Sequence, residues 1–218
     1  MDGIAPAPGV HVTVSRNARP PTRKGVVLHY SDIPASQDAG GVTSPLRTVL
    51  DCAATLPFAE ALAIADSALR RELLTGEQLV EAARRLRGAG RQRIWRVAVH
   101  ADGLAANPFE SGLRAIVIDT GVSGFEPQVT VRSGQLSMRV DLGDRVRRIA
   151  LEADSFTYHG SRDALERDCR RYNELVRSGW IVLRFAWEHV MFHQAWASAL
   201  IMETCALRDA ERRQTRQK

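Results

Sequence analysis

Apolar and polar residues alternate in two short runs near the N-terminus of this chain. The runs "VHVTVS" (10–15) and "GVVLHYS" (25–31) have the period of two that predicts strands. The segment between them, "RNARPPTRK", is basic and broken by prolines, which is typical of a loop. We therefore expect a hairpin with a long tip.

Helical spacing of apolar residues dominates the next part of the chain. Ser44 is a good N-cap, with Pro45 in the first helical position. A second helix is expected to begin near Pro57, and a third opens with the capping-box sequence Thr75-Gly-Glu-Gln78. A short fourth helix is expected from about residue 91 to 101.

The segment "DGLAANP" (102–108) has the composition of a joint between two modules. After it, the pattern predicts a helix, three strands, a helix, a strand and a helix. These elements are expected at 107–121, 127–131, 135–142, 146–154, 161–178, 180–185 and 187–207. The order predicts an α/β fold, a mixed sheet flanked by helices on both faces. We divide the chain into a small, mostly helical α+β region (1–103), the α/β module (104–207) and a charged tail (208–218).

Composition narrows the classes of protein to which the chain can belong. The chain has 44% hydrophobic and 25% charged residues, and no apolar run reaches the length of a membrane span. The cysteines are far apart and odd in number, so we expect reduced thiols in a cytoplasmic protein without a signal peptide. The net charge of +5 is carried mainly by arginine. Arginine suits phosphate contacts, although codon bias explains the shortage of lysine equally well.

Carboxylates interrupt the apolar pattern of two neighbouring strands. Glu152 and Asp154 share one strand face, and a turn near 144–146 would bring Asp141 opposite Glu152. Carboxylates that converge in this way raise one another's pKa or gather a cation, and Mg²⁺ prefers oxygen ligands. A second interpretation stays open, in which the acids form ordinary surface ion pairs with Arg139, Arg147 and Arg148.

Several short motifs occur in a fixed order across the second module. They are "ESGLR" (110–114), "PQV" (127–129), "RVDL" (139–142), "ALEAD" (150–154), "YHG" (158–160), "RDCRRYNEL" (167–175) and "GWIVLRF" (179–185). In type, order and spacing this run resembles the PD-(D/E)XK nuclease superfamily. More closely, it resembles nuclease-like domains related to very-short-patch repair endonucleases. The resemblance implies a restriction-endonuclease-like fold.

The resemblance also implies roles for particular residues. Asp141 and Glu152 would be ligands of Mg²⁺ or Mn²⁺, and Asp154 would take the position of the usual lysine. The expected catalytic set is Glu110, Asp141, Glu152, Asp154 and His159. Contacts to DNA are expected from Gln128, Arg139, Arg170, Arg171 and Arg184. Some of these residues have a second interpretation. Glu110 follows Asn107 at capping-box spacing, and His159 can be a half-exposed loop histidine. Arg170 and Arg171 can lie on a solvated helix face with Glu166 and Glu174 as partners.

The missing lysine is a departure from the nuclease pattern. Lysine is absent between residues 24 and 218, so its role falls to His159, to an arginine or to a water activated by the metal. Upstream, "VTSPLRTVLDCA" (42–53) and "ALAIADSALR" (61–70) resemble the middle region of AbiEi-type antitoxins, whose usual winged-helix segment we do not find here. We expect a metal-dependent DNA endonuclease. The alternative is a non-catalytic DNA-binding regulator of the type IV toxin–antitoxin kind, with a toxin–antitoxin partner.

Overall fold

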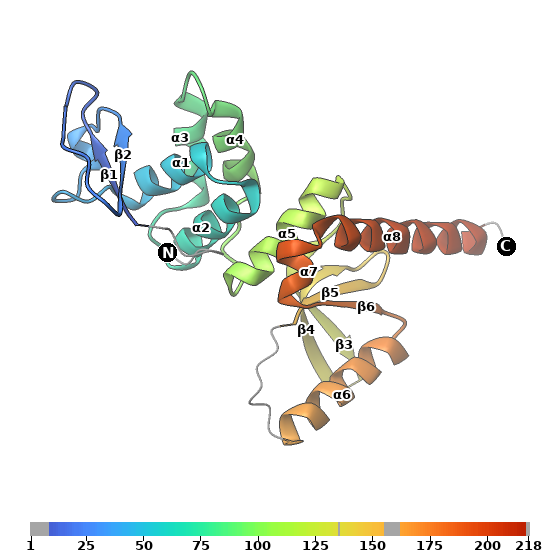
Figure 1. Cartoon of the computed structure of the whole chain (residues 1–218). Coiled ribbons are helices and arrows are strands. Elements are labelled where there is room, and N and C mark those ends of the chain that lie inside the picture. Colours follow the sequence, from blue (N-terminus) through green and yellow to red (C-terminus); the bar gives the residue numbers. More distant parts are fainter. Residues whose placement is uncertain (1–8, 135, 155–161, 217–218) are drawn as a thin grey trace. The chain divides into compact units, whose positions relative to one another are not determined.

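The computed structural model describes residues 9–134, 136–154 and 162–216, and the chain divides into two compact units (Figure 1). The first unit spans Met1–Asp102 and the second spans Gly103–Lys218. Each unit has a hydrophobic core of its own.

The first unit begins with two short strands, β1 (Val10–Val14) and β2 (Val26–Tyr30). They pair in parallel, with Val10 opposite Val26, so the expected hairpin is wrong. The reason lies in the connection through residues 15–25, which crosses back along the strands and returns the chain to the start of β1. The amide of Val10 accordingly donates to the carbonyl of Gly25 at 2.8 Å. A parallel pair needs such a crossover, whereas a tight turn makes an antiparallel pair.

Helices form the rest of the first unit, and their N-caps follow the sequence. A short 3₁₀ turn, η1 (Ala35–Gln37), precedes α1 (Pro45–Thr55), α2 (Phe58–Arg70), α3 (Gly76–Arg85) and α4 (Arg91–His100). The Ser44 hydroxyl accepts the first-turn amide of α1, and both hydrogen bonds of the Thr75–Gln78 capping box are present. The helices pack around a core that includes Val49, Ala65, Leu79 and Val97. The expected helix starts are confirmed.

The second unit is a mixed α/β fold, as the sequence predicts. Its elements are α5 (Pro108–Thr120), β3 (Glu126–Ser133), β4 (Leu136–Asp144), β5 (Ile149–Ala153), α6 (Arg162–Arg177), β6 (Ile181–Phe185), α7 (Trp187–Phe192) and α8 (Gln194–Arg216). The strands are ordered β3-β4-β5-β6. The first three are antiparallel neighbours, and β6 runs parallel to β5.

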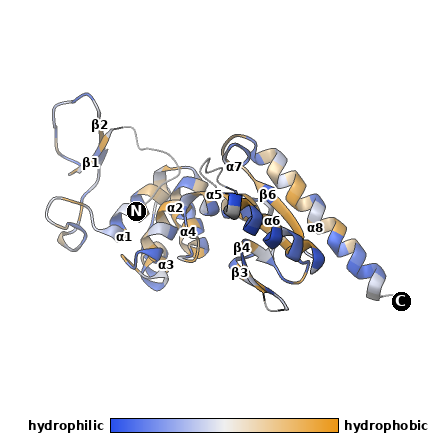
Figure 2. Cartoon of the chain, turned by 90° about the horizontal axis from the view of Figure 1, so that it is seen from below, coloured by the Kyte–Doolittle hydropathy of each residue, from blue (hydrophilic) through white to orange (hydrophobic). Residues whose placement is uncertain are grey.

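Helices cover both faces of this sheet. Figure 1 shows α6 on one face and α5, α7 and α8 on the other. One core cluster joins Leu142 and Leu151 to α5, α7 and α8, and the other joins Val140 and Ala150 to Leu175 of α6. Figure 2 shows a largely hydrophilic α6 over a hydrophobic β6. No helix within the described ranges has both the length and the apolar character needed to cross a bilayer.

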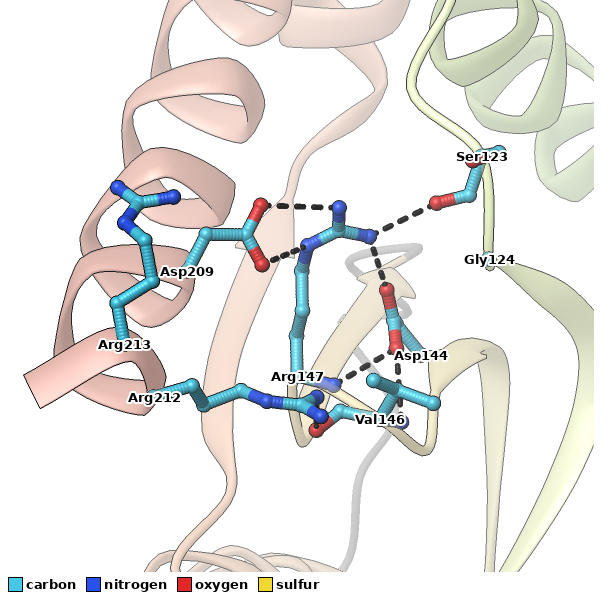
Figure 3. Close-up of a pocket in the computed structure, with 8 residues that line it drawn as sticks. All are labelled: Ser123, Gly124, Asp144, Val146, Arg147, Asp209, Arg212 and Arg213. Carbon is cyan, nitrogen blue, oxygen red and sulfur yellow. Dashed lines mark hydrogen bonds and ion pairs between the residues drawn. The ribbon is translucent and has the colours of Figure 1, made fainter. Parts of the chain in front are cut away.

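The C-terminal helix differs from its expected form. The expected single helix at 187–207 is broken at His193, and α8 then continues through the predicted charged tail to Arg216. The tail is helical because it is anchored to the sheet. Asp209 pairs with Arg147 of the β4–β5 turn, and Arg212 donates to the carbonyl of Val146 in the same turn (Figure 3).

Candidate active site

Asp141 of β4 and Glu152 of β5 lie one residue beyond the last pair of the ladder between these two strands. The ladder joins Leu142 to Leu151, so the same register, continued by one residue, sets Asp141 opposite Glu152. Asp141 and Glu152 interact electrostatically, and the carboxyl group of Asp141 accepts the amide of Ala153 at 2.9 Å. This is the adjacency that the turn position predicts from sequence.

The two carboxyl groups are sheltered from solvent, and their pKa values respond. Burial raises the pKa of Glu152 to about 7, against the opposing effect of Arg171 and with a further increase from Asp141. Burial also raises the pKa of Asp141, although the Ala153 amide and two arginines act in the other direction. The nearby arginines and the Ala153 amide therefore do not fully compensate the negative charge of the pair near neutral pH.

Arg171 of α6 supplies part of the missing charge. Its Nη2 donates to Glu152 Oε1 at 2.5 Å and to the carbonyl of Arg139 at 2.7 Å. The second interpretation of the sequence, in which Arg147 and Arg148 of the β4–β5 turn form ion pairs with these acids, differs from the structure. Arg147 pairs instead with Asp144 and Asp209, and Arg148 lies against Gly179. These two arginines lie at the turn end of the hairpin, whereas the acids lie at its open end.

Asp154 forms an ion pair with Arg184 of β6. Arg184 is opposite Glu152 in the β5–β6 register, and its guanidinium carbon lies 4.2 Å from the centre of the Tyr172 ring. The position at which the resemblance leads us to expect a lysine is thus occupied by an acid that holds an arginine. Tyr172 is a neighbour of the site that sequence reasoning missed; its only signal is its place directly after Arg171 in "RDCRRYNEL".

Glu110 uses both carboxylate oxygens in hydrogen bonds around the start of α5. Oε2 accepts the amide of Ala106 at 2.8 Å and Gln128 Nε2 at 2.7 Å, and Oε1 accepts Asn107 Nδ2 at 2.8 Å. Asn107 in turn caps the helix by accepting the Glu110 amide at 3.0 Å. The Asn107 cap is therefore present, but the reciprocal half of the capping box is not, because Glu110 accepts the backbone amide of Ala106 and not that of Asn107. Glu110 is still close enough to the acid pair for Asp141 to add to the burial that raises its pKa.

Gln128 links β3 to this corner in an unusual backbone conformation. Its φ of 53° lies in the left-handed region that non-glycine residues rarely adopt. The conformation interrupts the pairing of β3 with β4 beside Asp141, since Pro127 and Val129 are paired and Gln128 is not. Such strain persists where surrounding contacts hold it, and here the Gln128 side chain is held by Glu110.

The remaining predicted residues have different environments. Arg139 is exposed, yet close enough to lower the pKa of Asp141. Arg170 is on the solvated face of α6, 3.8 Å from Glu166, with both side chains more than 70% exposed. His159 lies outside the described residues, so its expected role stays a prediction.

The pocket in Figure 3 is separate from these acids. It has a volume of about 380 Å³ and lies at the turn end of the β4–β5 hairpin. Arg147 occupies its centre, where it donates to Asp144, Asp209 and the carbonyl of Ser123. These contacts join the turn to the end of β4, to α8 and to the segment before β3, which is a structural role.

The donor chemistry of the acid pair fits a hard divalent cation. Mg²⁺ is commonly held by one or two carboxylates and completes its shell with water and substrate oxygens. Glu152 is buried and Asp141 is half-buried, and burial raises the pKa of both carboxyl groups in spite of the nearby arginines. Within the described ranges, no group of three or more His, Cys, Asp or Glu side chains is arranged to hold a metal. Asp141 and Glu152 are the two carboxylates that would hold such a cation.

The chain is similar to two proteins of Mycobacterium tuberculosis. They are named uncharacterized protein MT2308 (strain CDC 1551 / Oshkosh) and uncharacterized protein Rv2248 (strain ATCC 25618 / H37Rv). Each is 30% identical over 163 residues, which are 73% of this chain and 60% of the relative's own length. No protein-family model and no solved structure matches the chain.

Proposed function

We propose that this protein is a metal-dependent DNA endonuclease of the PD-(D/E)XK type. The observation that carries the proposal is the pair of carboxyl groups formed by the half-buried Asp141 and the buried Glu152, beside the cations Arg171 and Arg184. Phosphodiester hydrolysis needs neutralisation of phosphate charge and activation of water. Acidic metal ligands beside arginines supply both requirements.

The topology of the second unit supports the proposal. A helix, an antiparallel three-strand meander, a second helix and a strand parallel to β5 follow one another from α5 to β6. A restriction-endonuclease-like core is expected to have this order. Because one fold can serve many functions, the topology supports the proposal only together with the acids.

Different residues of this chain would hold the cation and orient its ligands. Asp141 and Glu152 would hold the cation, which when bound supplies Lewis-acid chemistry to the phosphodiester. The Ala153 amide fixes the Asp141 carboxylate, and Arg171 fixes that of Glu152. The Glu110–Gln128 hydrogen bond ties the start of α5 to β3 next to Asp141. These contacts orient the ligands before DNA arrives.

A specific observation also favours a second function, that of a non-catalytic DNA-binding regulator of the AbiEi antitoxin kind. Glu152 and Asp154 are each paired with an arginine, so the protein can neutralise both acids without a metal. A nuclease scaffold whose acids serve only as internal ion pairs could still bind DNA through its basic residues.

Plasmid cleavage separates the two functions. Purified protein would be incubated with supercoiled plasmid in Mg²⁺, in Mn²⁺ and in EDTA, and nicked and linear products would be measured. We expect cleavage in the metal-containing reactions and none in EDTA. Asp141→Asn and Glu152→Gln should abolish it, because each removes one negative ligand at nearly constant volume.

The matched control is Glu126→Gln, an exposed acid of the same sheet that is 3.9 Å from Arg145. This variant should cleave as the wild type does. Plasmid binding without cleavage by folded wild-type protein would favour the regulator. Undiminished cleavage by Asp141→Asn would point to a contaminating nuclease or to another site.

A further inference from the structure

Arg184 differs from the other arginines near the acid pair in being fixed and still accessible. Asp154 holds its guanidinium by an ion pair, and Tyr172 supports it from one face at 4.2 Å. Its side chain remains 47% exposed. A guanidinium held between a carboxylate and an aromatic ring loses less freedom when it binds a further ligand.

The neighbouring arginines lack this combination. Arg171 has a side chain that is 26% exposed, and it is committed to Glu152 and to a backbone carbonyl. Arg170 is 72% exposed, and its acidic partner is 3.8 Å away on the same solvated helix face. Arg171 is thus fixed in position, but its hydrogen bonds are already used by protein groups. Arg170 is accessible to solvent, but its side chain has no close partner among the described residues that fixes it. Of these three described side chains, only Arg184 is both fixed in position and accessible to solvent.

The position of Arg184 matches a requirement of the reaction. It is opposite Glu152 in the strand register, on the face of the sheet that α6 covers, as Glu152 is. Asp154 stands where the resemblance expects a lysine. A planar guanidinium binds phosphate oxygens through two parallel hydrogen bonds, so it can replace an ammonium in this role.

We propose that Arg184, positioned by Asp154 and Tyr172, is the phosphate-binding cation of the Asp141–Glu152 site. Asp154 is then a positioning residue and not a metal ligand. This inference rests on the proposed nucleic-acid function of the same site, and it names the phosphate of DNA as the group that Arg184 contacts.

Binding to a short fluorescent DNA duplex tests the contact without requiring cleavage. Anisotropy would be measured in Ca²⁺ over a range of salt concentrations for the wild type, Arg184→Gln and the control Arg145→Gln. Arg145 lies in the turn at the far end of the hairpin and is 56% exposed, so the control makes the same charge change away from the acids. Arg184→Gln should weaken binding at least roughly tenfold and reduce the slope of log K against log salt by about 1. Arg145→Gln should have neither effect.

Two further variants test the positioning role of Asp154. Asp154→Asn removes a negative charge, so general electrostatics predicts equal or tighter DNA binding. If Asp154 positions Arg184, the same variant should cleave plasmid more slowly even though its DNA affinity is unchanged or higher. A residue with a purely structural role would not lower the cleavage rate while leaving DNA affinity intact. In Asp154→Lys/Arg184→Gln, a lysine takes the motif position, and cleavage should recover relative to Arg184→Gln alone.

The outcomes distinguish this inference from the proposed nuclease function. If the wild-type protein binds DNA without cleaving it, and Arg184→Gln loses affinity as predicted, the phosphate contact of Arg184 is supported and the nuclease proposal is wrong. Arg184→Gln that matches Arg145→Gln in affinity and salt slope ends the Arg184 inference, even if the protein cleaves. Folded wild-type protein that does not bind DNA overturns both.

Discussion

Asp141 is opposite Glu152 at the open end of the β4–β5 hairpin, one residue beyond the last pair of that ladder, yet different groups compensate the charges of the two carboxyl groups. Asp141 accepts a hydrogen bond from the backbone amide of Ala153, and Glu152 accepts one from the guanidinium of Arg171. Burial raises the pKa of both carboxyl groups in spite of these contacts. The pair therefore holds more negative charge near neutral pH than its surroundings neutralise.

The first prediction follows for Asp141→Asn in metal-free buffer. Because burial raises the pKa of Asp141 in the folded state, its ionised form destabilises the fold as pH rises. Asparagine stays neutral and retains an oxygen that can accept the Ala153 amide. We expect thermal denaturation in EDTA at mildly alkaline pH to give a Tm a few degrees above that of the wild type. A lower Tm would show that the carboxylate stabilises the metal-free protein.

The second prediction concerns the pH dependence contributed by Glu152. Its folded-state pKa of about 7 lies above the ordinary value of 4.5, so the stabilisation from its protonated form is complete below 4.5. This stabilisation is lost as pH rises through about 7 and amounts to about 3 kcal/mol. Denaturant titrations should show the wild type losing stability relative to Glu152→Gln across this window. A constant difference between the two proteins would contradict the raised pKa.

Arg147 is the subject of the third prediction. It pairs with Asp144, whose side chain is 1% exposed, and it joins the β4–β5 turn to Asp209 of α8 (Figure 3). Replacing Arg147 with methionine would leave Asp144 buried without its cation, which costs about 3 kcal/mol or more. Urea denaturation should show this loss. The neighbouring exposed Arg145→Met should change stability by no more than about 0.5 kcal/mol.

Glu110→Ala gives the fourth prediction, which separates the cap of α5 from the metal site. The change removes the acceptor for the Ala106 amide and for two side chains, so we expect a loss of stability of about 1–2 kcal/mol. Affinity for Mn²⁺ should stay near the wild-type value, because both Glu110 oxygens are already engaged. A loss of Mn²⁺ affinity as large as that in Asp141→Asn would instead make Glu110 a ligand.

Local patterns predicted most helix starts and the order of helices and strands along the second unit. Ser44, Thr75 and Asn107 cap their helices because capping needs only residues within one turn. The adjacency of Asp141 and Glu152 was also predictable, since strand alternation and a short turn fix it. The direction of β2 was not, because the path of a long connection depends on contacts that the local pattern does not encode.

Partners that come from distant parts of the chain were the harder feature to predict. Arg171 and Arg184 could be named as basic residues near the motifs, but the packing of α6 decides that Arg171 pairs with Glu152, and the pairing of β5 with β6 brings Arg184 to Asp154. The helical tail has the same origin. Its charged sequence indicates fraying, and only the turn at Val146 and Arg147 gives Asp209 and Arg212 their partners.

Titration calorimetry with Mn²⁺ tests most directly the central claim, that Asp141 and Glu152 jointly hold a divalent cation. The wild type and Glu126→Gln should bind the ion, with affinity that rises as pH increases through about 7, since Glu152 must lose its proton. Asp141→Asn and Glu152→Gln should each lose most of this binding. Absence of Mn²⁺ binding by folded wild-type protein, or binding unchanged in both variants, would contradict the account.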